Sequence, residues 1–479
     1  MSGFARELYT IYNYFVVLYF GAINSFYLML NVVALFSVRR QMLYSTFSHE
    51  VFQARYTPPI SLLVPAFNEV ATIAQSVRGL LLLEYPQYEV IVVNDGSQDD
   101  TLQILKNEFS LYAIGKETVD AVPTQPIVEI YKSRAYPSLV VVDKENGGKA
   151  DSLNAGINIS QFPLICAIDA DSIVEPDALA KVAWPFLQDP ERVVATGGSV
   201  RVINDGSIEA GRVIETRVPH KWRVRVQVVE YLRAFLLGRQ GLSVLKMLLI
   251  ISGAFGLFRK DIVIEVGGYR SGCIGEDMEL VVRIHHKLRQ WKRPYRIEFV
   301  PDPVCWTEAP EDLSTLRKQR NRWHRGLMDT LRLHKAMLFN PRYGRIGLIT
   351  FPYFIFFELF GPIVELTGYI TVPLAFAFGY VDLQFFWLFI SVAILYGIFL
   401  SVSSVLIEEI SFHKYERVTD LLILFAASVI ENFGYRQLTV LWRTQAFFDY
   451  LRGNRSWGEM TRRGFAAGTD TDGKQGPSM

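Results

Sequence analysis

The sequence predicts an α/β domain with a mostly parallel sheet, inserted between helical segments that are long enough to span a membrane. Short β-branched and apolar runs alternate with stretches of helical period between residues 57 and 340, which is typical of βαβ units. Uncharged apolar runs precede and follow this region. Half of the 479 residues are apolar and the mean hydropathy is positive, so we expect more than a soluble domain.

Residues 1–40 are predicted to form an N-terminal transmembrane helix. Ile11–Val38 contains no charged side chain, and its length exceeds the ~20 residues that cross a bilayer as a helix. A cleaved signal peptide fits less well, because the run is too long and no small-residue cleavage site follows it. Arg39 and Arg40 come next, so the positive-inside rule places the following domain in the cytoplasm.

Four apolar runs are expected to form buried strands of the domain at 57–340. They are continuous rather than alternating in polarity, as in strands that are covered on both faces. They are Ile60–Val64, Val90–Val93, Leu139–Val142 and Leu164–Ile168. We therefore expect a parallel core with helices on either side.

Residues 341–452 are predicted to form transmembrane and interfacial helices. Leu383–Ile407 is a second uncharged run of spanning length. Ile346–Val381 is apolar except for Glu358 and Glu365, which lie seven residues apart and would share one face of a helix. Residues 418–450 are interpreted as a helical hairpin or a re-entrant pair.

Charge and cysteine content exclude several classes of protein. The net charge of +1 indicates no nucleic-acid partner. The cysteines are three, widely spaced and without a CxxC pair, which argues against disulfide and zinc frameworks. Gly434–Arg463 holds six arginines against two acids, so residues 453–479 are expected to be a basic and then disordered cytoplasmic tail. The expected location is a multi-pass protein of the inner or plasma membrane.

Polar residues follow the first two predicted strands. Asn68 and Glu69 come after the first, and Asp95 comes after the second. Ligands of doubly wound sheets bind outside the carboxyl ends of the strands, so these residues indicate a nucleotide pocket. The alternative is that Asn68 and Asp95 only cap the helices that follow.

Two further patterns carry charges suited to a phosphorylated ligand. Two glycines stand between Lys144 and Lys149, and such a loop approaches a ligand closely, although a surface turn is the ordinary alternative. Asp169 and Asp171 follow the fourth strand, where a divalent cation bridging to a diphosphate would neutralise them.

Two helical segments carry the remaining candidates. Glu276 and Asp277 precede a helical run, either as acidic residues at a positive helix terminus or as a general base. Residues 319–323, with the sequence QRNRW, lie on a basic helix. Its arginines could hold a diphosphate and its indole a sugar ring, and an interfacial amphipathic helix is the alternative.

The motifs PAFNE, NDGS, the glycine–lysine loop, DAD, GED and QRNRW, in this order, resemble those of family-2 glycosyltransferases. The similarity runs from Ser61 to Leu327 and is greatest to the membrane synthases of cellulose, chitin, hyaluronan and poly-N-acetylglucosamine. It implies a GT-A nucleotide-diphospho-sugar transferase domain between transmembrane helices.

The resemblance implies a role for each matched residue. The catalytic residues would be Asp277 as the base, with Glu276 and Arg322. Those implied to bind donor or acceptor are Asn68, Glu69, Asp95, Lys149, Asp169, Ser252, Gly253, Gln319 and Trp323. Asp171, with Asp169, would hold Mg²⁺ or Mn²⁺. Arg320 is a further candidate for the diphosphate.

The implied reaction is a single inverting displacement that uses a UDP-sugar to extend a β-linked polysaccharide and couples this to secretion. N-acetylglucosamine is preferred as the sugar from overall likeness. Transfer of one sugar to a lipid acceptor is the alternative, since QxxRW occurs in both groups of enzymes. Expected partners are the nucleotide sugar, a growing glycan or lipid acceptor and the bilayer, and the resemblance allows accessory secretion proteins.

One segment departs from the better-known synthases. Arg212–Lys246 carries eight basic and two acidic residues among apolar and aromatic ones. It is interpreted as an interfacial helix or as a grip on a lipid-diphosphate acceptor, with an exposed charged helix as the third alternative.

Overall fold

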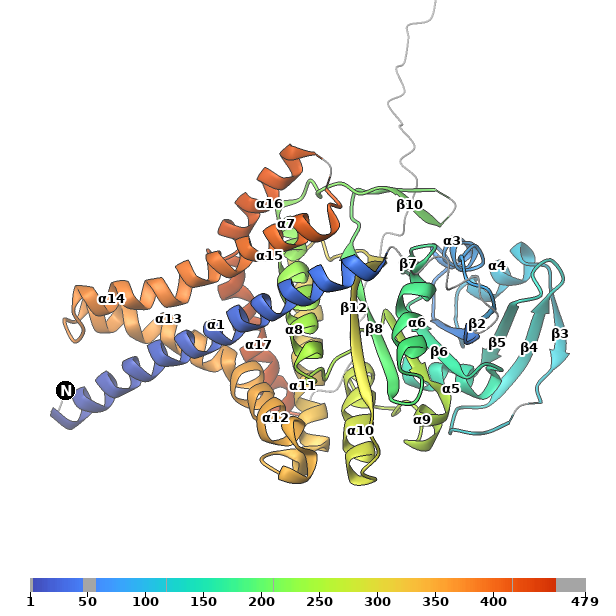
Figure 1. Ribbon diagram of the computed structural model, residues 1–479, viewed down its shortest axis with the longest axis horizontal. Coiled ribbons are helices and arrows are strands. Elements are labelled where there is room, and N and C mark those ends of the chain that lie inside the picture. The colour runs from blue at the N-terminus through green and yellow to red at the C-terminus, as the bar shows by residue number, and fades with distance from the viewer. Residues whose placement is uncertain (1–2, 46–56, 118, 210, 416, 454–479) are drawn as a thin grey trace, which may run out of the picture.

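A computed structural model describes residues 3–45, 57–117, 119–209, 211–415 and 417–453. Its central element is a sheet of ten strands in the order β3-β4-β5-β2-β1-β6-β11-β8-β12-β7 (Figure 1). The strands, in chain order, are β1 Ile60–Ala66, β2 Tyr88–Asp95, β3 Leu111–Gly115, β4 Ile127–Ser133, β5 Leu139–Lys144, β6 Leu164–Ile168, β7 Ile173–Val174, β8 Val193–Val202, β11 Phe255–Arg259 and β12 Arg296–Thr307. A separate ribbon pairs β9 (Ser207–Glu209) with β10 (Arg212–Glu215).

The four predicted strands are β1, β2, β5 and β6, and they lie side by side and parallel as expected. The sheet is mixed but mostly parallel, as expected, because β4, β7 and β11 run against the direction of the other seven strands. Strand β11 lies antiparallel between β6 and β8, and β3, β4 and β7 also pair antiparallel. These strands are short or lie near the sheet edges, so they lack the long apolar runs that mark the central ones.

Helices cover both faces of the sheet. Helix α5 (Lys149–Ile159) packs on β1 and β2, and α6 (Ala178–Gln188) packs on β8 and β12. The remaining helices of this half are α3 Ile73–Leu80, α4 Thr101–Glu108 and α9 Lys260–Glu265. Two longer helices, α10 (Glu276–Gln290) and α11 (Leu313–Leu333), extend from the sheet toward the apolar helices (Figure 1).

Residues 222–244 of the basic segment form a continuous helical stretch between the sheet and the apolar helices, whereas its first residues form β10. The stretch comprises α7 (Trp222–Glu230), the π-helix η1 (Tyr231–Gly238) and α8 (Arg239–Val244). It packs on α1 and α15 on one side and on β8 and β12 on the other. Most of its apolar side chains are buried, so the alternative of an exposed charged helix is wrong.

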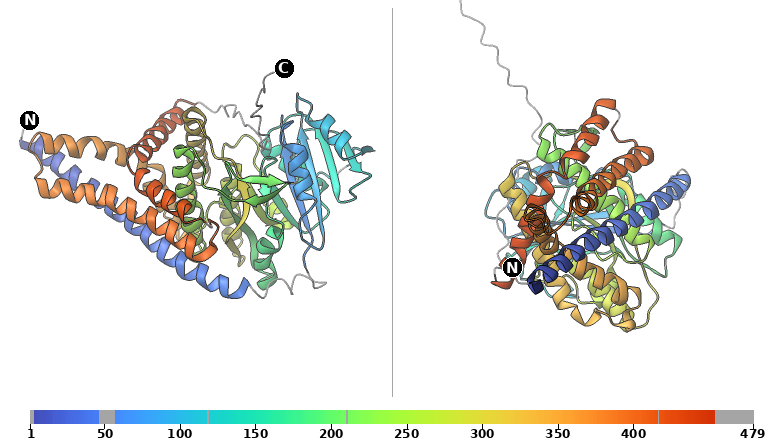
Figure 2. Two further views of the ribbon diagram at one scale, coloured as in Figure 1. Left: turned by 90° about the horizontal axis from the view of Figure 1, so that it is seen from above. Right: turned by 90° about the vertical axis from the view of Figure 1, so that its left-hand side faces the viewer.

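Apolar helices form the other half of the molecule and extend away from the sheet (Figure 2). Two are long and apolar enough to cross a membrane: Glu7–Arg39 within α1 (Gly3–Ser45), and Leu383–Phe412, which comprises α14 (Leu383–Ile390), η6 (Ser391–Leu395) and α15 (Tyr396–Phe412). Both predicted spanning runs are therefore helical. Residues 454–479, which include most of the predicted tail, lie outside the described residues.

Two further helix pairs are bent. The predicted pair at 418–450 consists of α16 (Val418–Ile430) and α17 (Tyr435–Leu451), bent by 55°. The stretch before α14 comprises η4 Ile346–Thr350, α12 Phe351–Tyr353, η5 Phe354–Leu359 and α13 Gly361–Ala377, with a bend of 42° between Leu359 and Gly361. Glu358 and Glu365 therefore do not share one face of a continuous helix, because a new helix begins at Gly361, with Pro362 in its first turn.

A buried ion pair joins the sheet to an apolar helix. The guanidinium of Arg201, on β8, lies 3.1 Å from a carboxylate oxygen of Glu408, on α15, and their side chains are 4% and 1% exposed. Each charge is out of water and depends on the other for compensation.

Removing one partner of this pair is expected to destabilise the protein. Glu408→Leu leaves the Arg201 charge buried and unpaired, which costs roughly 3–5 kcal/mol. Thermal unfolding in detergent measures the loss, and the double variant Arg201→Met/Glu408→Leu should recover most of it. Asp177→Asn, which removes a partly exposed ion pair with Lys181, is the matched control. Equal melting temperatures for Glu408→Leu and the control would contradict the assigned role.

Candidate active site

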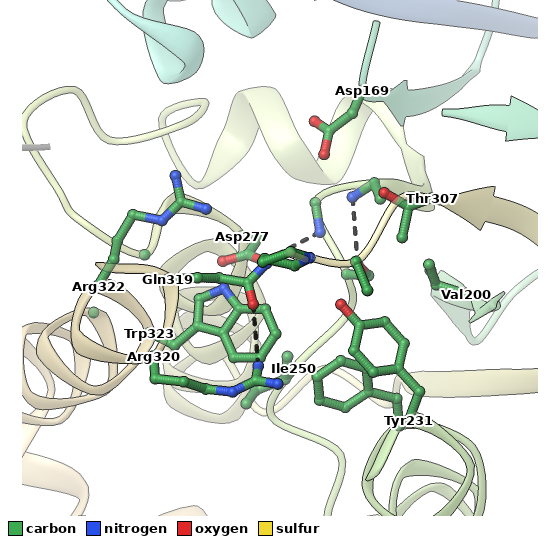
Figure 3. A pocket seen from close by; sticks show the side chains of 18 of the residues that line it. Asp169, Val200, Tyr231, Ile250, Asp277, Thr307, Gln319, Arg320, Arg322 and Trp323 are labelled. Carbon is green, nitrogen blue, oxygen red and sulfur yellow. Dashed lines mark hydrogen bonds between the residues drawn. The ribbon is translucent and has the colours of Figure 1, made fainter. Parts of the chain in front are cut away.

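A cavity of about 2260 Å³ lies between the carboxyl ends of the strands and the apolar helices. Every residue implied by the motifs lines it except Asn68. Figure 3 shows Asp169, Asp277, Gln319, Arg322 and Trp323 around this space. Segments that are far apart in the sequence thus meet at one place.

Asn68 stabilises a turn instead of facing the cavity. Its side-chain oxygen accepts a hydrogen bond from the backbone N–H of Gln98 at 2.8 Å, and its own N–H donates to the hydroxyl of Ser97 at 3.0 Å. Its φ of 56° is in the left-handed region, which asparagine tolerates well. Glu69 lines the cavity, and Thr72 donates to its carboxylate. The expected contact of Asn68 with uridine therefore stays a prediction, and the alternative that Asn68 caps the following helix is wrong, because its side chain bonds the loop after β2.

Asp95 orders the glycine loop. Its carboxylate accepts backbone N–H groups of Gly147 at 3.0 Å and Gly148 at 2.8 Å, and it pairs with the buried ammonium of Lys144 at 2.8 Å. Gly148 has a φ of 86°, which favours glycine. The loop is therefore held from inside the protein, and it delivers Lys149 as the first residue of α5.

Lys149 lies at the meeting point of the acidic residues. Its ammonium pairs with Asp169, lies 3.6 Å from a carboxylate oxygen of Glu276 and donates to the carbonyl of Gly253 at 3.3 Å. Burial alone would lower the pKa of Lys149, but Asp169 and Glu276 raise it above its ordinary value. Burial raises the pKa of Glu276, and Lys149 opposes this shift.

Asp277 is held by a backbone N–H. One of its carboxylate oxygens accepts from Gly253 at 3.1 Å, which fixes the side chain beside the loop before β11. The approach is close, because a Cβ at position 253 would lie 3.0 Å from the Lys149 ammonium and 3.4 Å from the Asp277 Cβ. Ser252 lines the cavity next to this contact. The carboxylate of Asp277 is thus oriented within the cavity, as a general base requires.

A glycine pair joins the helix of Asp277 to the helix of the QRNRW motif. A Cβ on Gly275 would lie 3.2 Å from the backbone of Gly326, and the converse distance is the same. The start of α10 and the middle of α11 therefore touch backbone to backbone. This contact sets the position of Asp277 relative to Arg322 and Trp323, which stand on the preceding turn of α11.

Arg320 and Arg322 of the QRNRW motif stand on α11. Arg320 is 3% exposed, pairs with Glu230 at 2.6 Å and donates to the hydroxyl of Tyr435 at 3.3 Å. Its guanidinium also stacks on Trp323 at 4.4 Å and donates to Gln319. Arg320 is therefore engaged by neighbouring side chains, and Arg322 lines the same cavity from α11 (Figure 3).

Asp169 and Asp171 fit a divalent cation that is completed by its ligand. Both line the cavity, and among the described residues no cluster of three or more His, Cys, Asp or Glu side chains could hold a metal by itself. Mg²⁺ is commonly held by one or two carboxylates together with substrate phosphates and water. The donor set is consistent with that arrangement.

The cavity continues to the apolar helices, where ion pairs line it. Arg443 of α17 lies 3.3 Å from Glu358, and Arg436 of the same helix lies 3.6 Å from Glu365. The hydroxyls of Tyr27 and Tyr353 donate to Glu358 at 2.7 and 2.9 Å. The two carboxylates therefore both line the cavity and pair with arginines.

Sequence reasoning missed the cavity wall formed by η1 and the start of α8. Tyr231, Phe235 and Arg239 line the cavity at a spacing of four residues. The evident feature of this segment in the sequence is its basic charge. Its aromatic residues at a spacing of four are the pattern that predicts a wall of this kind.

Comparison with known proteins identifies the family. The model described as Glycosyltransferase like family 2 matches residues 58–326. Among curated proteins, the poly-β-1,6-N-acetyl-D-glucosamine synthase of Staphylococcus aureus is 31% identical over 270 residues, covering 56% of this chain and 54% of that protein. The enzyme of the same name from Staphylococcus epidermidis is 28% identical over 305 residues, covering 62% and 63%. The chain thus matches between one half and two thirds of these relatives' lengths.

Among solved structures, a mannosyltransferase from Pyrobaculum calidifontis, in complex with GDP-Man and Mn²⁺, covers 85% of this chain and 99% of its own. Its TM-score is 0.47 and its identity 19%, which is too distant to assign a donor or a metal. The family match spans the sheet, the glycine loop, the acidic strand end and the helices of Asp277 and Arg322. The chain belongs to glycosyltransferase family 2, with a GT-A domain next to helices that could span a membrane.

Proposed function

We propose that the chain is a membrane-integrated, metal-dependent, inverting glycosyltransferase that extends a β-linked polysaccharide from a UDP-sugar. UDP-N-acetylglucosamine is the proposed donor, supported by the names of the curated relatives. The observation that carries the proposal is the continuous cavity, which joins the strand ends, Asp277 and the apolar helices. A site of this form has room for a donor at one end and an elongating chain at the other.

The proposed donor end is the region around Asp95, Lys149 and Asp169. The glycine loop positions Lys149, which would supply one ammonium to a diphosphate, and Arg322 lines the same cavity from α11. The metal, held by Asp171 and Asp169, would supply charge stabilisation to the leaving diphosphate. Positive groups arranged in advance at a site of developing charge are a main source of catalysis.

The proposed base is Asp277. It takes the proton from a hydroxyl of the acceptor terminus, and the oxygen attacks the anomeric carbon of the donor. The bond between that carbon and the phosphate oxygen breaks, and UDP leaves with the electron pair. A single displacement inverts the configuration, so an α-linked donor gives a β-linked product.

Extension of a polymer is favoured over single transfer to a lipid by the polar end of the cavity. Glu358, Glu365, Arg436 and Arg443 line it among the apolar helices, and charged groups in such a layer are retained for function. Their hydrogen-bonding groups suit a hydroxylated chain better than a lipid tail. We propose that this end admits the product for secretion, with the catalytic domain in the cytoplasm, as Arg39 and Arg40 favour.

The experiment that tests the proposal measures UDP release by the purified protein in detergent across a panel of nucleotide sugars, with product sizing on a gel. A high-molecular-weight product with UDP-N-acetylglucosamine and Mg²⁺ or Mn²⁺ is expected. A single added sugar that appears only with a lipid acceptor would support the alternative.

Asp277→Asn is expected to lower kcat about 10²–10⁴-fold, because the amide cannot accept the acceptor's proton. The affinity for UDP should stay within about twofold, since the side chain keeps its size and Asp277 is assigned to the acceptor. UDP release and UDP titration measure the two effects. Asp261→Asn, a change of the same kind on an exposed carboxylate of α9, is the control. Substantial activity in Asp277→Asn would rule out the base assignment.

Asp171→Ala is expected to abolish the enhancement of UDP binding by Mn²⁺, because it removes a metal-binding carboxylate. UDP titrations with and without Mn²⁺ measure the effect in both proteins. Asp177→Ala, on the surface nearby in the sequence, should behave as the unmodified protein does. An unchanged Mn²⁺-dependent affinity in Asp171→Ala would disprove the metal assignment.

A further inference from the structure

The helix that carries Asp277 is anchored by a side chain outside the cavity. Glu279 lies two residues after Asp277 in α10, and its side chain is fully buried. Asp277 and Met278 line the cavity, whereas Glu279 is not among the described residues that do so. The residue before α10 is Gly275, which has no side chain to cap the helix, so the position of the first turn depends on contacts such as those of Glu279.

The carboxylate of Glu279 is held by one imidazole and two guanidinium groups. Its Oε2 accepts a hydrogen bond from Arg283, on the next turn of α10, at 2.7 Å. Its Oε1 lies 3.1 Å from Nε2 of His334 and 3.6 Å from Arg270. Burial alone would raise the pKa of Glu279, but the hydrogen bond from His334 and the charges of the two arginines lower it below its ordinary value. The carboxylate is therefore ionised and compensated inside the protein.

A hydrogen-bonded chain leads from the protein surface to Glu279. Nε2 of His286 lies 3.0 Å from the amide nitrogen of the exposed Gln290, and Nδ1 of His286 lies 3.0 Å from Nδ1 of His334. An amide nitrogen only donates and a carboxylate only accepts, so the chain has one direction. Gln290 donates to His286, and His286 donates to His334. His334 in turn donates to Glu279. Both imidazoles are neutral in this arrangement, in agreement with the pKa of His286, which burial and the neighbouring His334 lower to about 4.

The second partner of Glu279 connects α10 to the helix of the glycine loop. Arg283 donates to the carbonyls of Val266 and Gly268 at 3.0 and 2.7 Å. Asn154 of α5 donates to the carbonyl of Tyr269 at 2.9 Å and accepts from its N–H at 2.7 Å. The turn at 266–269 is thus held by both α10 and α5, the helix that begins at the end of the glycine loop.

Two contacts fix α10 against α11, which lies beside it (Figure 1). One is the close approach of Gly275 to Gly326, described above. The other is the pair of Glu279 with His334, the residue at which α11 ends, eight residues after Gly326. A single contact lets one helix pivot on another, whereas two separated contacts define its orientation.

We propose that Glu279 and His334 are positioning residues for the transfer reaction. Their buried pair fixes the first turn of α10 against the end of α11, and so it places the carboxylate of Asp277 relative to the QRNRW helix. Neither residue touches a substrate, and both act through Asp277. This inference rests on the proposed function and assigns the groups that orient its base. Misplacement of a reacting group by about 1 Å can lower a rate about 100-fold.

Two substitutions at His334 separate the hydrogen bond to Glu279 from the packing of the ring. The amide nitrogen of glutamine takes the place of Nε2, so His334→Gln keeps a donor to Glu279. Asparagine is one methylene shorter and reaches only the place of Nδ1, so His334→Asn loses that donor. We expect His334→Asn to lower kcat for UDP release about 10–100-fold. His334→Gln should stay within about threefold of the unmodified protein, and the affinity of both variants for UDP within about twofold.

Hydrogen–deuterium exchange, measured by mass spectrometry, reports the same contact without turnover. Peptides that cover Gly275–Arg283 should exchange about tenfold faster in His334→Asn than in the unmodified protein, because the first turn loses a hydrogen bond to a buried charge. His334→Gln should protect this segment nearly as well as histidine does. His413→Asn, at an exposed histidine where α15 ends, is the matched control and should change neither kcat nor exchange.

Equal kcat in His334→Asn, His334→Gln and the control would overturn the positioning role. An equal loss in both His334 variants would also overturn it, because the donor to Glu279 would then make no difference, and so would a parallel loss of UDP affinity. Failure of the proposed function is distinct, since it appears as an unmodified protein that releases no UDP from any donor. In that case faster exchange in His334→Asn alone would still support the placement of α10, and unchanged exchange would overturn it.

Discussion

The ammonium of Lys149 is the interaction on which the arrangement of the site depends. Asp169, Glu276 and Asp277 come from distant parts of the chain, and their carboxylates would repel one another in a partly dry cavity. Lys149 forms an ion pair with Asp169 and lies near Glu276. It also donates to the carbonyl of Gly253, and the N–H of Gly253 in turn holds Asp277. One cation thus joins the glycine loop, the end of β6, the loop before β11 and the start of α10. The hydrogen bonds that the amides of the glycine loop donate to Asp95 bring Lys149 to this position.

A second set of contacts connects this site to the apolar half of the molecule. Arg320 links α11 to Glu230 of α7 and to Tyr435 of α17, and Arg201 links β8 to Glu408 of α15. The helical stretch 222–244 lies between the two halves and contributes to the cavity wall. Asp277 and Arg322 therefore stand on elements that are packed against the apolar helices, so their position relative to the polar end of the cavity is defined.

The parts of this structure that local sequence specifies were predictable. The four central strands and the spanning helices are long apolar runs, and all the motif residues but Asn68 line one cavity. What was missed depends on tertiary pairing. The antiparallel β11 has no distinctive local pattern, and the break between Glu358 and Glu365 follows from where Pro362 starts a helix. Tyr231, Phe235 and Arg239 have the pattern of an ordinary basic helix in the sequence. They line the cavity only because α11 packs nearby and brings Trp323 against Phe235.

The sequence alone suggests that the catalytic domain ends near residue 340. The contacts of the helical stretch 222–244 show that the chain cannot simply be truncated there. A fragment that ends there would expose the apolar surfaces that α7 and η1 present to α15 and α16, and it would leave Arg320 without the hydroxyl of Tyr435 and Arg201 without its counterion. Such a truncated protein would aggregate or lose the geometry of the cavity wall that η1 forms. Biochemical work on this chain is therefore best done on the full-length protein in detergent or nanodiscs, even when only the sugar chemistry is of interest.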